Sequence, residues 1–392
     1  MSRADRIFSV ADARTHAQRR MPRMVFDYVD GAAGSEAGNR LNCEVLDAIR
    51  LLPRVLINVE ERSLTKSFLG RDWGLPFGIA PMGMCNLTWP GADAILARAA
   101  ARHDIPLCLS TAASSTIERT RERAGENAWF QLYVGHSQEV SMDLVRRADE
   151  AGYEVLMLTV DVPQVSHRLR DLKNGFQVPF RIGPRQFLDF ARHPSWSLGT
   201  LAAGVPVTAN FTDYVDSKST DKVFKAWVRN EGRGRIDWQF LEMLRESWPR
   251  TLMVKGVLAP ADALVAKERG VDGLYVSNHG GRQLDSAPAA IHMLPLIRRA
   301  VGEGYPLLFD SGVRNGESIV KALALGADFV MLGRTWLYDA IGADGEHGME
   351  KMIEVLGEEI SLAMAQLGRC QLADIDESLI FHHETAAGTT FE

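Results

Sequence analysis

The stretch from Ser277 to Asp285 gathers residues that could move a proton at neutral pH. Its sequence, SNHGGRQLD, follows an apolar run and places His279 beside two glycines, where the side chain is free to meet a substrate. An unperturbed imidazole titrates near neutrality, which suits a general base. Arg282, three residues further on, can grip a carboxylate through its planar guanidinium group. The stretch therefore predicts the chemical part of an active site.

Other polar side chains support this interpretation, although a single histidine is more often structural. Asp161 could orient His279 and stabilise its protonated form. A second arginine, a lysine and two tyrosines complete the predicted cluster: Arg168, Lys255, Tyr28 and Tyr133. Two arginines and two tyrosines around a base predict a site for a small anionic acid.

Two glycine-containing turns with arginines predict a phosphate site. FDSGVRNGES (309–318) and MLGRTW (331–336) each open a helical stretch, and each contains a glycine and an arginine. Bare backbone at a helix N-terminus supplies N–H donors, and arginines add bidentate bonds to phosphate oxygens. The implied ligand is a phosphorylated molecule, and a flavin nucleotide fits the span. No G-x-G-x-x-G follows an early strand, so a Rossmann-type nicotinamide site is not expected.

These groups follow short apolar runs that alternate with helical patterns. The candidate strands are 76–82, 105–110, 128–134, 155–161, 251–255, 273–277, 306–310 and 329–332. Parallel neighbours need a crossover of helix length, and eight such strands close a (β/α)₈ barrel. The predicted fold class is therefore α/β, a TIM barrel with its active site at the carboxyl ends of the strands. Turn-forming caps alone would not explain a lysine, a histidine and four arginines after apolar strands.

We expect residues 1–392 to form a single domain. Helical patterns over 9–21, 24–30 and about 39–50 predict an N-terminal helical cap (1–70), followed by the barrel (71–375) and a tail (376–392). An insertion after the fourth strand, 176–235, is too long for an ordinary loop. It carries nine basic and five acidic residues with aromatic residues between them. It is predicted to be an amphipathic lid or a membrane-surface patch or, equally, a packed excursion with solvated charges.

Composition excludes several classes of protein. The chain has 392 residues, 46% of them hydrophobic and 24% charged, which is ordinary for a globular protein. A net charge of −6 argues against a nucleic-acid binder. The four cysteines lie far apart without metal-ligand spacing, which indicates reduced thiols in a cytosol-like compartment and no metal site. We expect no secretory signal and no membrane-spanning helix. His382 and His383 are expected in a surface tail.

The motifs together resemble those of the FMN-dependent α-hydroxy acid dehydrogenase/oxidase family, which includes glycolate oxidase, flavin-type L-lactate dehydrogenases and mandelate dehydrogenase. SNHGGRQ (277–283) matches the family signature around its catalytic histidine, and the resemblance covers roughly residues 8–375. Further matching strings are FDYVDGAAGSE (26–36), APMG (80–83), LST (109–111), WFQLYV (129–134), LTVDVP (158–163), RDLKNGF (170–176), VKG (254–256), DSGVRNG (310–316) and LGR (332–334).

The resemblance implies FMN at the carboxyl ends of the barrel strands and a role for each matching residue. His279 would take the substrate proton and would be paired with Asp161. Together with Arg282, these two residues would form the catalytic group. The substrate carboxylate would be held by Arg168 and Arg282 with the hydroxyls of Tyr28 and Tyr133. Lys255 would be the cation near flavin N1. The remaining cofactor contacts implied are Ala80, Pro81, Met82, Gly83, Ser110, Gln131, Thr159, Ser277, Asp310, Gly312, Arg314, Gly333 and Arg334.

Two stretches depart from the family pattern. The usual Asp-Gly-Gly is Asp310-Ser311-Gly312 here, which affects fine loop geometry. Before Arg168 the chain has Gln164-Val165-Ser166-His167, where many members carry Arg and Gly, so substrate contacts are expected to differ there.

The function that the resemblance implies is oxidation of an (S)-2-hydroxy acid, lactate- or mandelate-like, to the 2-oxo acid. Gly83, where many oxidases have alanine, and the insertion favour a dehydrogenase that passes electrons to a quinone or another carrier. Ala112 leaves room over the substrate side chain. The protein is expected in the cytoplasm, with peripheral contact through 176–235 at the inner face of the cell membrane, as a homo-oligomer, since the family is often tetrameric. The alternatives are an oxidase that uses oxygen and produces hydrogen peroxide, a flavin-dependent isomerase, and a catalytically silent flavoprotein.

Overall fold

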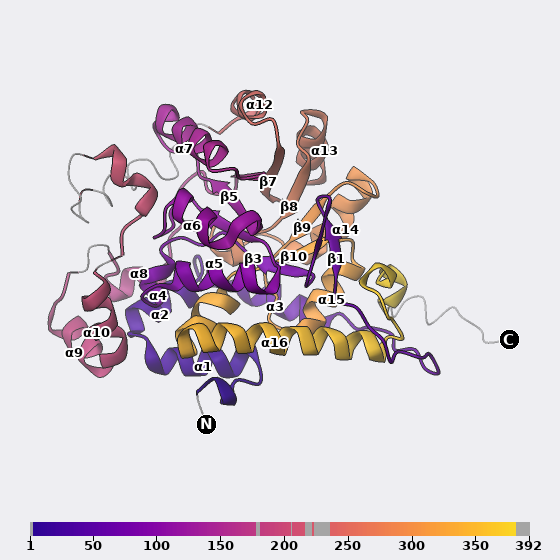
Figure 1. Cartoon of the computed structure of the whole chain (residues 1–392), viewed down its shortest axis with the longest axis horizontal. Coiled ribbons are helices and arrows are strands. Elements are labelled where there is room, and N and C mark those ends of the chain that lie inside the picture. Colours follow the sequence, from indigo (N-terminus) through magenta and orange to yellow (C-terminus); the bar gives the residue numbers. More distant parts are fainter. Residues whose placement is uncertain (1–2, 178–180, 205, 216–221, 223–235, 382–392) are drawn as a thin grey trace.

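Eight parallel strands close into a barrel at the centre of the molecule (Figure 1). The computed structural model describes residues 3–177, 181–204, 206–215, 222 and 236–381. Neighbouring strands pair in chain order from β3 to β10, and β10 pairs back onto β3. The strands are β3 Phe77–Ile79, β4 Leu107–Ser110, β5 Ala128–Leu132, β6 Val155–Thr159, β7 Thr251–Val257, β8 Gly273–Val276, β9 Leu307–Phe309 and β10 Phe329–Leu332. The predicted barrel and its eight strands are confirmed.

A helix follows each barrel strand and returns the chain to the opposite rim. Several of these helices begin at a residue whose side chain accepts a hydrogen bond from the first turn, as Thr116, Ser137 and Asn315 do. The helices are α5 Ala92–His103, α6 Ile117–Ala124, α7 Gln138–Glu150, α12 Trp238–Ser247, α13 Pro260–Glu268, α14 Ala290–Val301, α15 Gly316–Ala324 and α16 Gly342–Gln366. Short helices accompany them: α4 Cys85–Thr88, η2 Gly125–Asn127, η4 His279–Gly281, η5 Thr335–Ile341, η6 Leu372–Asp374 and η7 Glu377–Leu379.

A two-stranded hairpin closes the amino-terminal end of the barrel. Its strands, β1 Lys66–Phe68 and β2 Arg71–Trp73, pair antiparallel outside the barrel sheet. The rings of Phe68 and Trp73 lie against Trp129 and Phe329 of the barrel interior, with centroid separations between 5.4 and 6.4 Å. Sequence analysis missed this hairpin because each strand has only three residues. Because these rings fill the amino-terminal end of the barrel, a ligand is expected to enter from the opposite rim, where the strands have their carboxyl ends.

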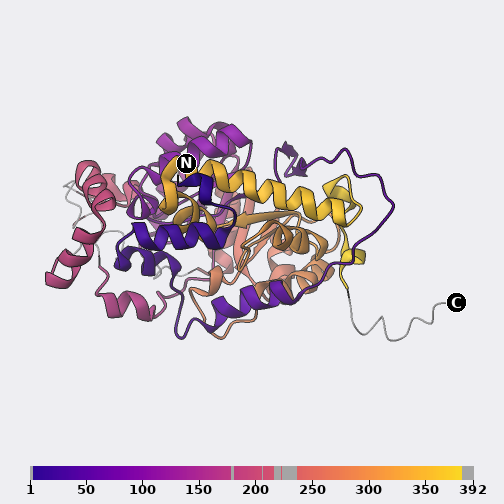
Figure 2. The same cartoon turned by 90° about the horizontal axis from the view of Figure 1, so that it is seen from below.

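The N-terminal cap consists of η1 Ala4–Arg6, α1 Val10–Arg20, α2 Arg23–Asp30 and α3 Ala37–Ala48, close to the predicted helical ranges. Helix α1 lies beside the C-terminal helix α16 in both views of the ribbon (Figures 1 and 2). A side chain on Gly342 would stand 3.1 Å from Ala17 Cβ, so the two segments are in close contact. The described end of the tail returns to the cap, where Ile380 forms a bridge with Leu51. His382 and His383 lie outside the described residues.

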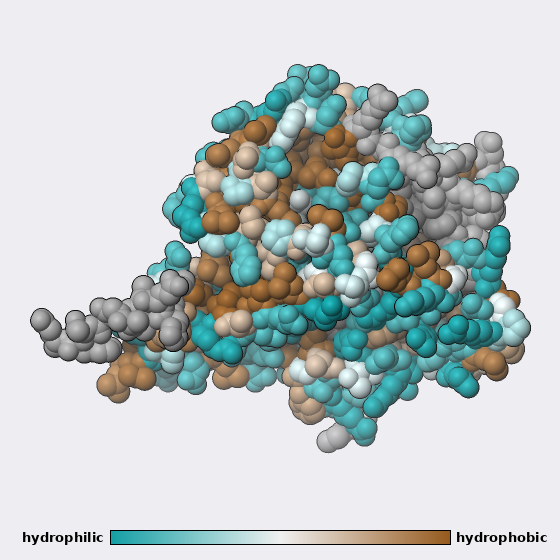
Figure 3. All heavy atoms as spheres, turned by 180° about the vertical axis from the view of Figure 1, so that it is seen from behind, coloured by the Kyte–Doolittle hydropathy of each residue, from teal (hydrophilic) through white to brown (hydrophobic). Residues whose placement is uncertain are grey.

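The insertion leaves the barrel after β6 and forms α8 Leu169–Asn174, α9 Pro184–Arg192, α10 Pro194–Ala203 and η3 Ala209–Tyr214. Residues 178–180, 205, 216–221 and 223–235 of the predicted insertion lie outside the described residues. Both ribbon views place α9 and α10 at one end of the molecule, away from the barrel axis (Figures 1 and 2). On the face behind Figure 1, apolar and polar side chains are intermingled (Figure 3).

Candidate active site

A cavity of about 540 Å³ opens at the carboxyl ends of the barrel strands, between the barrel loops and helix α2 of the cap. The predicted site residues that line it are Tyr28, Ala80, Pro81, Met82, Gly83, Tyr133, Arg168, Lys255, His279, Arg282, Asp310, Gly312, Arg314, Gly333 and Arg334. The other predicted residues lie next to these: Asp161 contacts His279, Ser277 contacts Lys255, and Ser110, Gln131 and Thr159 stand near the carboxyl ends of β4, β5 and β6. The structure therefore brings the predicted site together at one rim.

The conformation of the loop after β8 aims the His279 imidazole into the cavity. His279, Gly280 and Gly281 have φ values of +59°, +62° and +72°, a left-handed run that glycine adopts readily. A side chain at Gly281 would come within 2.5 Å of the Asn39 backbone nitrogen, so only glycine permits this approach of the cap. The Asn278 side chain accepts a hydrogen bond from the Gly281 N–H at 3.2 Å and stabilises the turn.

The two ring nitrogens of His279 face different partners. Nδ1 lies 3.0 and 3.2 Å from the two carboxylate oxygens of Asp161, and Nε2 lies 3.4 Å from the Tyr133 hydroxyl on the cavity side. Burial disfavours the charged form of Asp161, but its interactions with His279 and Lys255 outweigh burial, so the pKa of Asp161 stays below its ordinary value. An ionised Asp161 fixes the proton on Nδ1 and leaves Nε2 as the base.

Arginines also line the cavity. The guanidinium carbons of Arg168 and Arg282 each lie 5.5 Å from the centroid of the Tyr28 ring. Burial, and then the positive charges of Arg168 and Arg334, lower the pKa of Arg282 to about 9. Three buried or half-buried cations in one cavity repel one another, so binding of an anion is favoured there.

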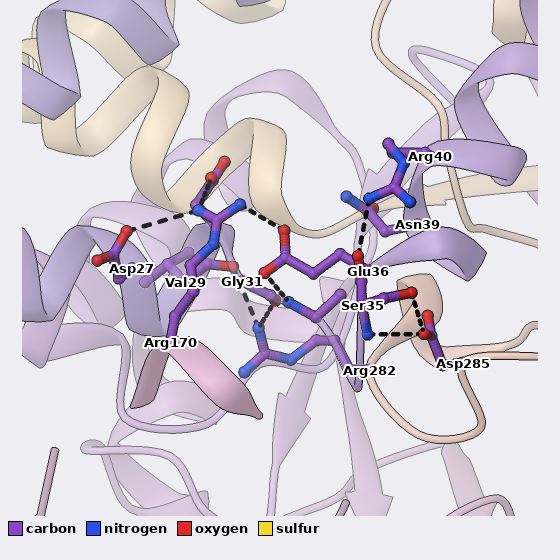
Figure 4. A network of polar contacts seen from close by, with 12 residues as sticks. Asp27, Val29, Gly31, Ser35, Glu36, Asn39, Arg40, Arg170, Arg282 and Asp285 are labelled. Carbon is purple, nitrogen blue, oxygen red and sulfur yellow. Dashed lines mark hydrogen bonds and ion pairs between the residues drawn. The ribbon is translucent and has the colours of Figure 1, made fainter. Parts of the chain in front are cut away.

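The Arg282 side chain also fixes the cap over the site. Its Nη1 donates to the carbonyl oxygens of Tyr28, Val29 and Gly31 at 2.8 to 3.1 Å (Figure 4). Among the described residues these three bonds all leave from Nη1, so Nε and Nη2 can serve a ligand. The predicted planar grip on a carboxylate is thus restricted to part of the guanidinium group.

The predicted phosphate end differs in detail from the expectation. Arg334 lines the cavity, but its guanidinium group donates to the carbonyl oxygens of Val29, Gly31 and Gly280 at 2.8 to 3.0 Å and to Asn39 Oδ1 at 3.1 Å. Arg334 therefore joins the cap to the His279 loop as well as lining the cavity. Arg314 lines the same end, and its Nη1 donates to the Val313 carbonyl oxygen at 2.8 Å.

Ser311, the departure from the family's Asp-Gly-Gly, connects two loops of the site. Its φ is +87°, a conformation that glycine adopts more readily. Its hydroxyl donates to Asp310 Oδ1 at 2.8 Å and accepts from the Asn278 and Gly280 N–H groups at 3.3 and 3.1 Å. The backbone around His279 is thereby tied to the loop after β9.

Sequence reasoning missed the contacts that fasten the cap. Arg170 binds Asp27, Asp30 and Glu36, and Asp285 accepts hydrogen bonds from the Ser35 backbone and hydroxyl at 2.8 and 2.9 Å (Figure 4). Arg170 lies in the motif RDLKNGF and Asp285 in SNHGGRQLD. Their place in these motifs was the signal available in the sequence.

Phe176 is a further missed residue of the cavity wall. Its ring stacks on Tyr28 with the centroids 4.4 Å apart. It opens the predicted insertion, so the site and the insertion share a boundary.

The described part of the insertion packs through some of its side chains and exposes several large apolar ones. Trp196 is buried, and its indole donates to the Leu87 carbonyl oxygen at 3.0 Å. Phe187 of α9 is 64% exposed and Leu201 of α10 is 79% exposed. Among the described residues no helix is both long and apolar enough to cross a membrane. The buried Trp196 agrees with a packed excursion, and the membrane-surface patch stays a prediction.

Comparison with known proteins assigns this arrangement to a family. Residues 17–382 match the family model for FMN-dependent dehydrogenases. The chain is 40% identical to the (S)-mandelate dehydrogenase of Pseudomonas putida over 363 residues, which cover 92% of this chain and 91% of that protein. It is 38% identical to an L-lactate dehydrogenase of Pseudomonas syringae pv. syringae (strain B728a), with 95% and 98% covered.

A solved structure gives the same result at the level of the fold. The crystal structure of the monotopic membrane protein (S)-mandelate dehydrogenase matches with a TM-score of 0.91 and 38% identity, over 96% of this chain and 99% of that one. Because the family model and these relatives span nearly the whole chain, the protein belongs to the FMN-dependent dehydrogenase family.

Proposed function

We propose that this FMN-dependent dehydrogenase oxidises an (S)-2-hydroxy acid, lactate- or mandelate-like, to the 2-oxo acid and passes the electrons to a quinone or another carrier. The observation that carries the proposal is the orientation of His279, with Nδ1 on Asp161 and Nε2 in a cavity that also contains Arg168 and Arg282. A base and two cations in one cavity fit a substrate with a hydroxyl next to a carboxylate.

Two buried polar groups support FMN binding at the strand ends. Gln131 Nε2 and Thr159 Oγ1 are buried and, among the described residues, have no hydrogen-bond partner. Leaving such a group unpaired costs about 1 to 3 kcal/mol, so a ligand with polar atoms is expected beside them. The edge of an isoalloxazine ring, with its carbonyl oxygens and ring nitrogens, fits this pair.

The remaining cofactor roles follow from position in the cavity or directly beside it. Ser110 bonds to Gln131 at 2.9 Å and would complete the contact with the ring edge. Lys255 is 3% exposed and would balance negative charge near flavin N1, with Ser277 bonded to its ammonium group at 2.8 Å. Asp310 would hold the ribityl chain. The residues that would lie against the ring or the phosphate are Ala80, Pro81, Met82, Gly83, Gly312, Arg314, Gly333 and Arg334.

Substrate binding and proton removal would use other residues of the same cavity. The substrate carboxylate would bind Arg168 and the available nitrogens of Arg282, with the hydroxyls of Tyr28 and Tyr133 alongside. His279 Nε2 would take a proton from the substrate, and Asp161 would stabilise the imidazolium ion that forms. When bound, FMN supplies the acceptor for the two electrons.

The substrate side chain would meet an apolar wall. Ala112, Val162, Val165 and Phe176 line the cavity. Small and branched side chains leave room for a methyl or phenyl substituent and offer a charged substituent no partner. The relatives named (S)-mandelate dehydrogenase and L-lactate dehydrogenase act on acids of this kind.

The proposal is tested by anaerobic stopped-flow reduction of the FMN-loaded protein with both enantiomers of mandelate and lactate. We expect the (S) enantiomers to bleach the flavin and the (R) enantiomers to leave it oxidised. An isomerase would instead bind a phosphorylated substrate without net bleaching, and no 2-hydroxy acid would reduce its flavin. The proposal fails if no 2-hydroxy acid reduces the flavin, and its electron-carrier part fails if oxygen reoxidises the enzyme as fast as it turns over.

We also propose that α9 and α10 place the enzyme on a membrane surface. Phe187, Leu188, Leu198 and Leu201 are exposed there, and the similar crystal structure is of a monotopic membrane protein. All four cysteines are free thiols, which supports a location on the cytoplasmic side. Cosedimentation with anionic vesicles should weaken in Phe187→Ser/Leu201→Ser. The matched change Leu264→Ser/Leu296→Ser on α13 and α14 should have no effect, and equal loss in both would refute the assignment.

We propose that the protein forms a homo-oligomer, a tetramer, through the exposed apolar loop that precedes the barrel. Val55 is 80% exposed, and Leu52, Leu56 and Ile57 are exposed beside it. Light scattering of the purified protein should give four times the chain mass, and a monomer mass would reject the proposal.

A further inference from the structure

Tyr275 lies inside the barrel, next to residues that the proposed function assigns to the cofactor. It belongs to β8, where the sequence pattern predicts an apolar strand, and it is fully buried with Met157, Met253 and Leu308. It pairs in register with Lys255 of the neighbouring strand β7. A buried tyrosine needs a partner for its hydroxyl group, and here that partner is charged.

The Tyr275 hydroxyl donates to Asp310 Oδ2 at 2.8 Å. The other carboxylate oxygen, Oδ1, accepts from the Ser311 hydroxyl at 2.8 Å, so each oxygen of Asp310 already accepts one hydrogen bond. Burial, followed by the negative charge of Asp310, raises the pKa of Tyr275 well above its ordinary value. Tyr275 therefore remains protonated and acts as a donor at neutral pH.

The same tyrosine contacts Lys255. The Lys255 ammonium group lies 4.7 Å from the centroid of the Tyr275 ring and donates to the Ser277 hydroxyl at 2.8 Å. It stands 3.6 Å from Asp310 Oδ2, the oxygen that Tyr275 occupies. A direct ammonium–carboxylate hydrogen bond has a length of about 2.7 to 2.9 Å, so this ion pair is held apart.

We propose that Tyr275 is a positioning residue that keeps the charge of Lys255 directed into the cavity. Its hydroxyl occupies the Asp310 oxygen nearest the ammonium group, and its ring face supports that group from the barrel side. Without the hydroxyl, Asp310 would draw Lys255 into a closed ion pair, and the pair would present less positive charge to the ligand. This inference rests on the proposed position of FMN beside Lys255.

The test is the midpoint potential of bound FMN in Tyr275→Phe, which keeps the ring and removes only the hydroxyl. Because a reduced flavin is more negative than an oxidised one, we expect the variant to bind reduced FMN about tenfold less tightly relative to oxidised FMN. That factor is a fall of about 30 mV in a two-electron potential. The Kd of the apoprotein for oxidised FMN should change by less than the same tenfold.

Tyr153→Phe is the matched control, since Tyr153 is also fully buried and its hydroxyl donates to the Ile117 carbonyl oxygen at 2.8 Å outside the cavity. The control should leave the potential unchanged. An unchanged potential in Tyr275→Phe, or an equal fall in the control, overturns the inference. Weaker binding of oxidised FMN without a change in potential also overturns it, because Tyr275 would then only shape the site.

Asp310→Asn gives a second measurement if Tyr275→Phe folds poorly. Removing the carboxylate charge 3.6 Å from the Lys255 ammonium group leaves more of the lysine charge directed at the ligand, so the potential must rise; a potential that is equal or lower contradicts the inference. If the native protein fails to bind FMN or is not reduced by any 2-hydroxy acid, the proposed function fails instead. The two failures are therefore distinguishable.

Discussion

Asp161→Asn tests whether the contact between Asp161 and His279 serves the chemical step. The substitution keeps the shape of the side chain and removes its charge. Asparagine can still accept a hydrogen bond from His279 Nδ1, which Asp161 contacts at 3.0 Å, but it does not stabilise the imidazolium ion. Its amide can also turn and donate to Nδ1, which would place the proton on Nε2 and remove the base.

The size of the effect can be worked out from the geometry. Two unit charges 3.0 Å apart attract by about 5.5 kcal/mol at an effective dielectric constant of 20. The retained hydrogen bond and the nearby charge of Lys255 reduce this, and hydrogen bonds to charged groups contribute about 1.5 to 3 kcal/mol. A loss of about 3 kcal/mol from the transition state slows the reaction roughly 100-fold.

The assay is anaerobic flavin reduction by a saturating (S)-2-hydroxy acid, together with titration of the apoprotein with FMN. We expect the reduction rate to fall about 100-fold while the Kd for FMN changes little, because Asp161 does not line the cavity. Asp272→Asn is the control: its carboxylate accepts from the Leu252 N–H at 2.8 Å at the start of β7, and the rate should be unchanged. A rate for Asp161→Asn within threefold of the native rate would refute the reasoning.

Three further predictions concern the substrate, the cavity and the cap. Arg168→Met should weaken binding of the substrate carboxylate 10- to 100-fold, from the loss of about 1.5 to 3 kcal/mol, and equal KM values in variant and native enzyme would contradict this. Gly83→Ala places a Cβ 3.1 Å from Ala112 Cβ, so KM should rise more for mandelate than for lactate; a uniform change would show that this wall does not face the side chain. Burial opposes ionisation of Asp30, but Arg14 and Arg170 hold its pKa below the ordinary value, so its stabilisation is present above about pH 4 and is lost as the pH falls further. Denaturant unfolding should therefore show a steeper loss of stability below pH 4 in the native protein than in Asp30→Asn, and parallel curves would disprove the linkage.

The barrel could be predicted from sequence because each of its strands and helices is marked by a pattern of neighbouring residues. Each strand is a short apolar run with a helical pattern after it, and polar residues such as Lys255 and Asp310 mark where the runs end. The β1–β2 hairpin could not be predicted in this way, since KSF and RDW are too short to show a period. Tyr275 escaped notice for a related reason: inside the run GLYVS it has the pattern of a strand residue, and its charged neighbours come from other strands.

The contacts that hold the N-terminal cap against the barrel could not be predicted from sequence because they join distant parts of the chain. Arg170 and Asp30 are 140 residues apart, and Asp285 and Ser35 are 250 apart. Nothing in the spacing of the residues pairs them. Only the closed barrel, which brings the loops after β6 and β8 to one rim, makes these partners neighbours. The types of the site residues could thus be predicted, whereas the bonds of Arg282 and Arg334 to the cap could not.

The hydrogen bond from Arg334 to the Gly31 carbonyl oxygen joins residues 303 positions apart. It can form only after the ribosome has made both residues. At translation rates of about 5 to 20 residues per second, the ribosome needs roughly 15 to 60 s after making Gly31 before Arg334 exists. Throughout that interval the cap has no Arg334 to bind, and α1 has no α16 to pack against. The nascent chain therefore cannot assemble a complete flavin pocket until its last strand has been made. We therefore expect FMN to be captured late in translation or after it.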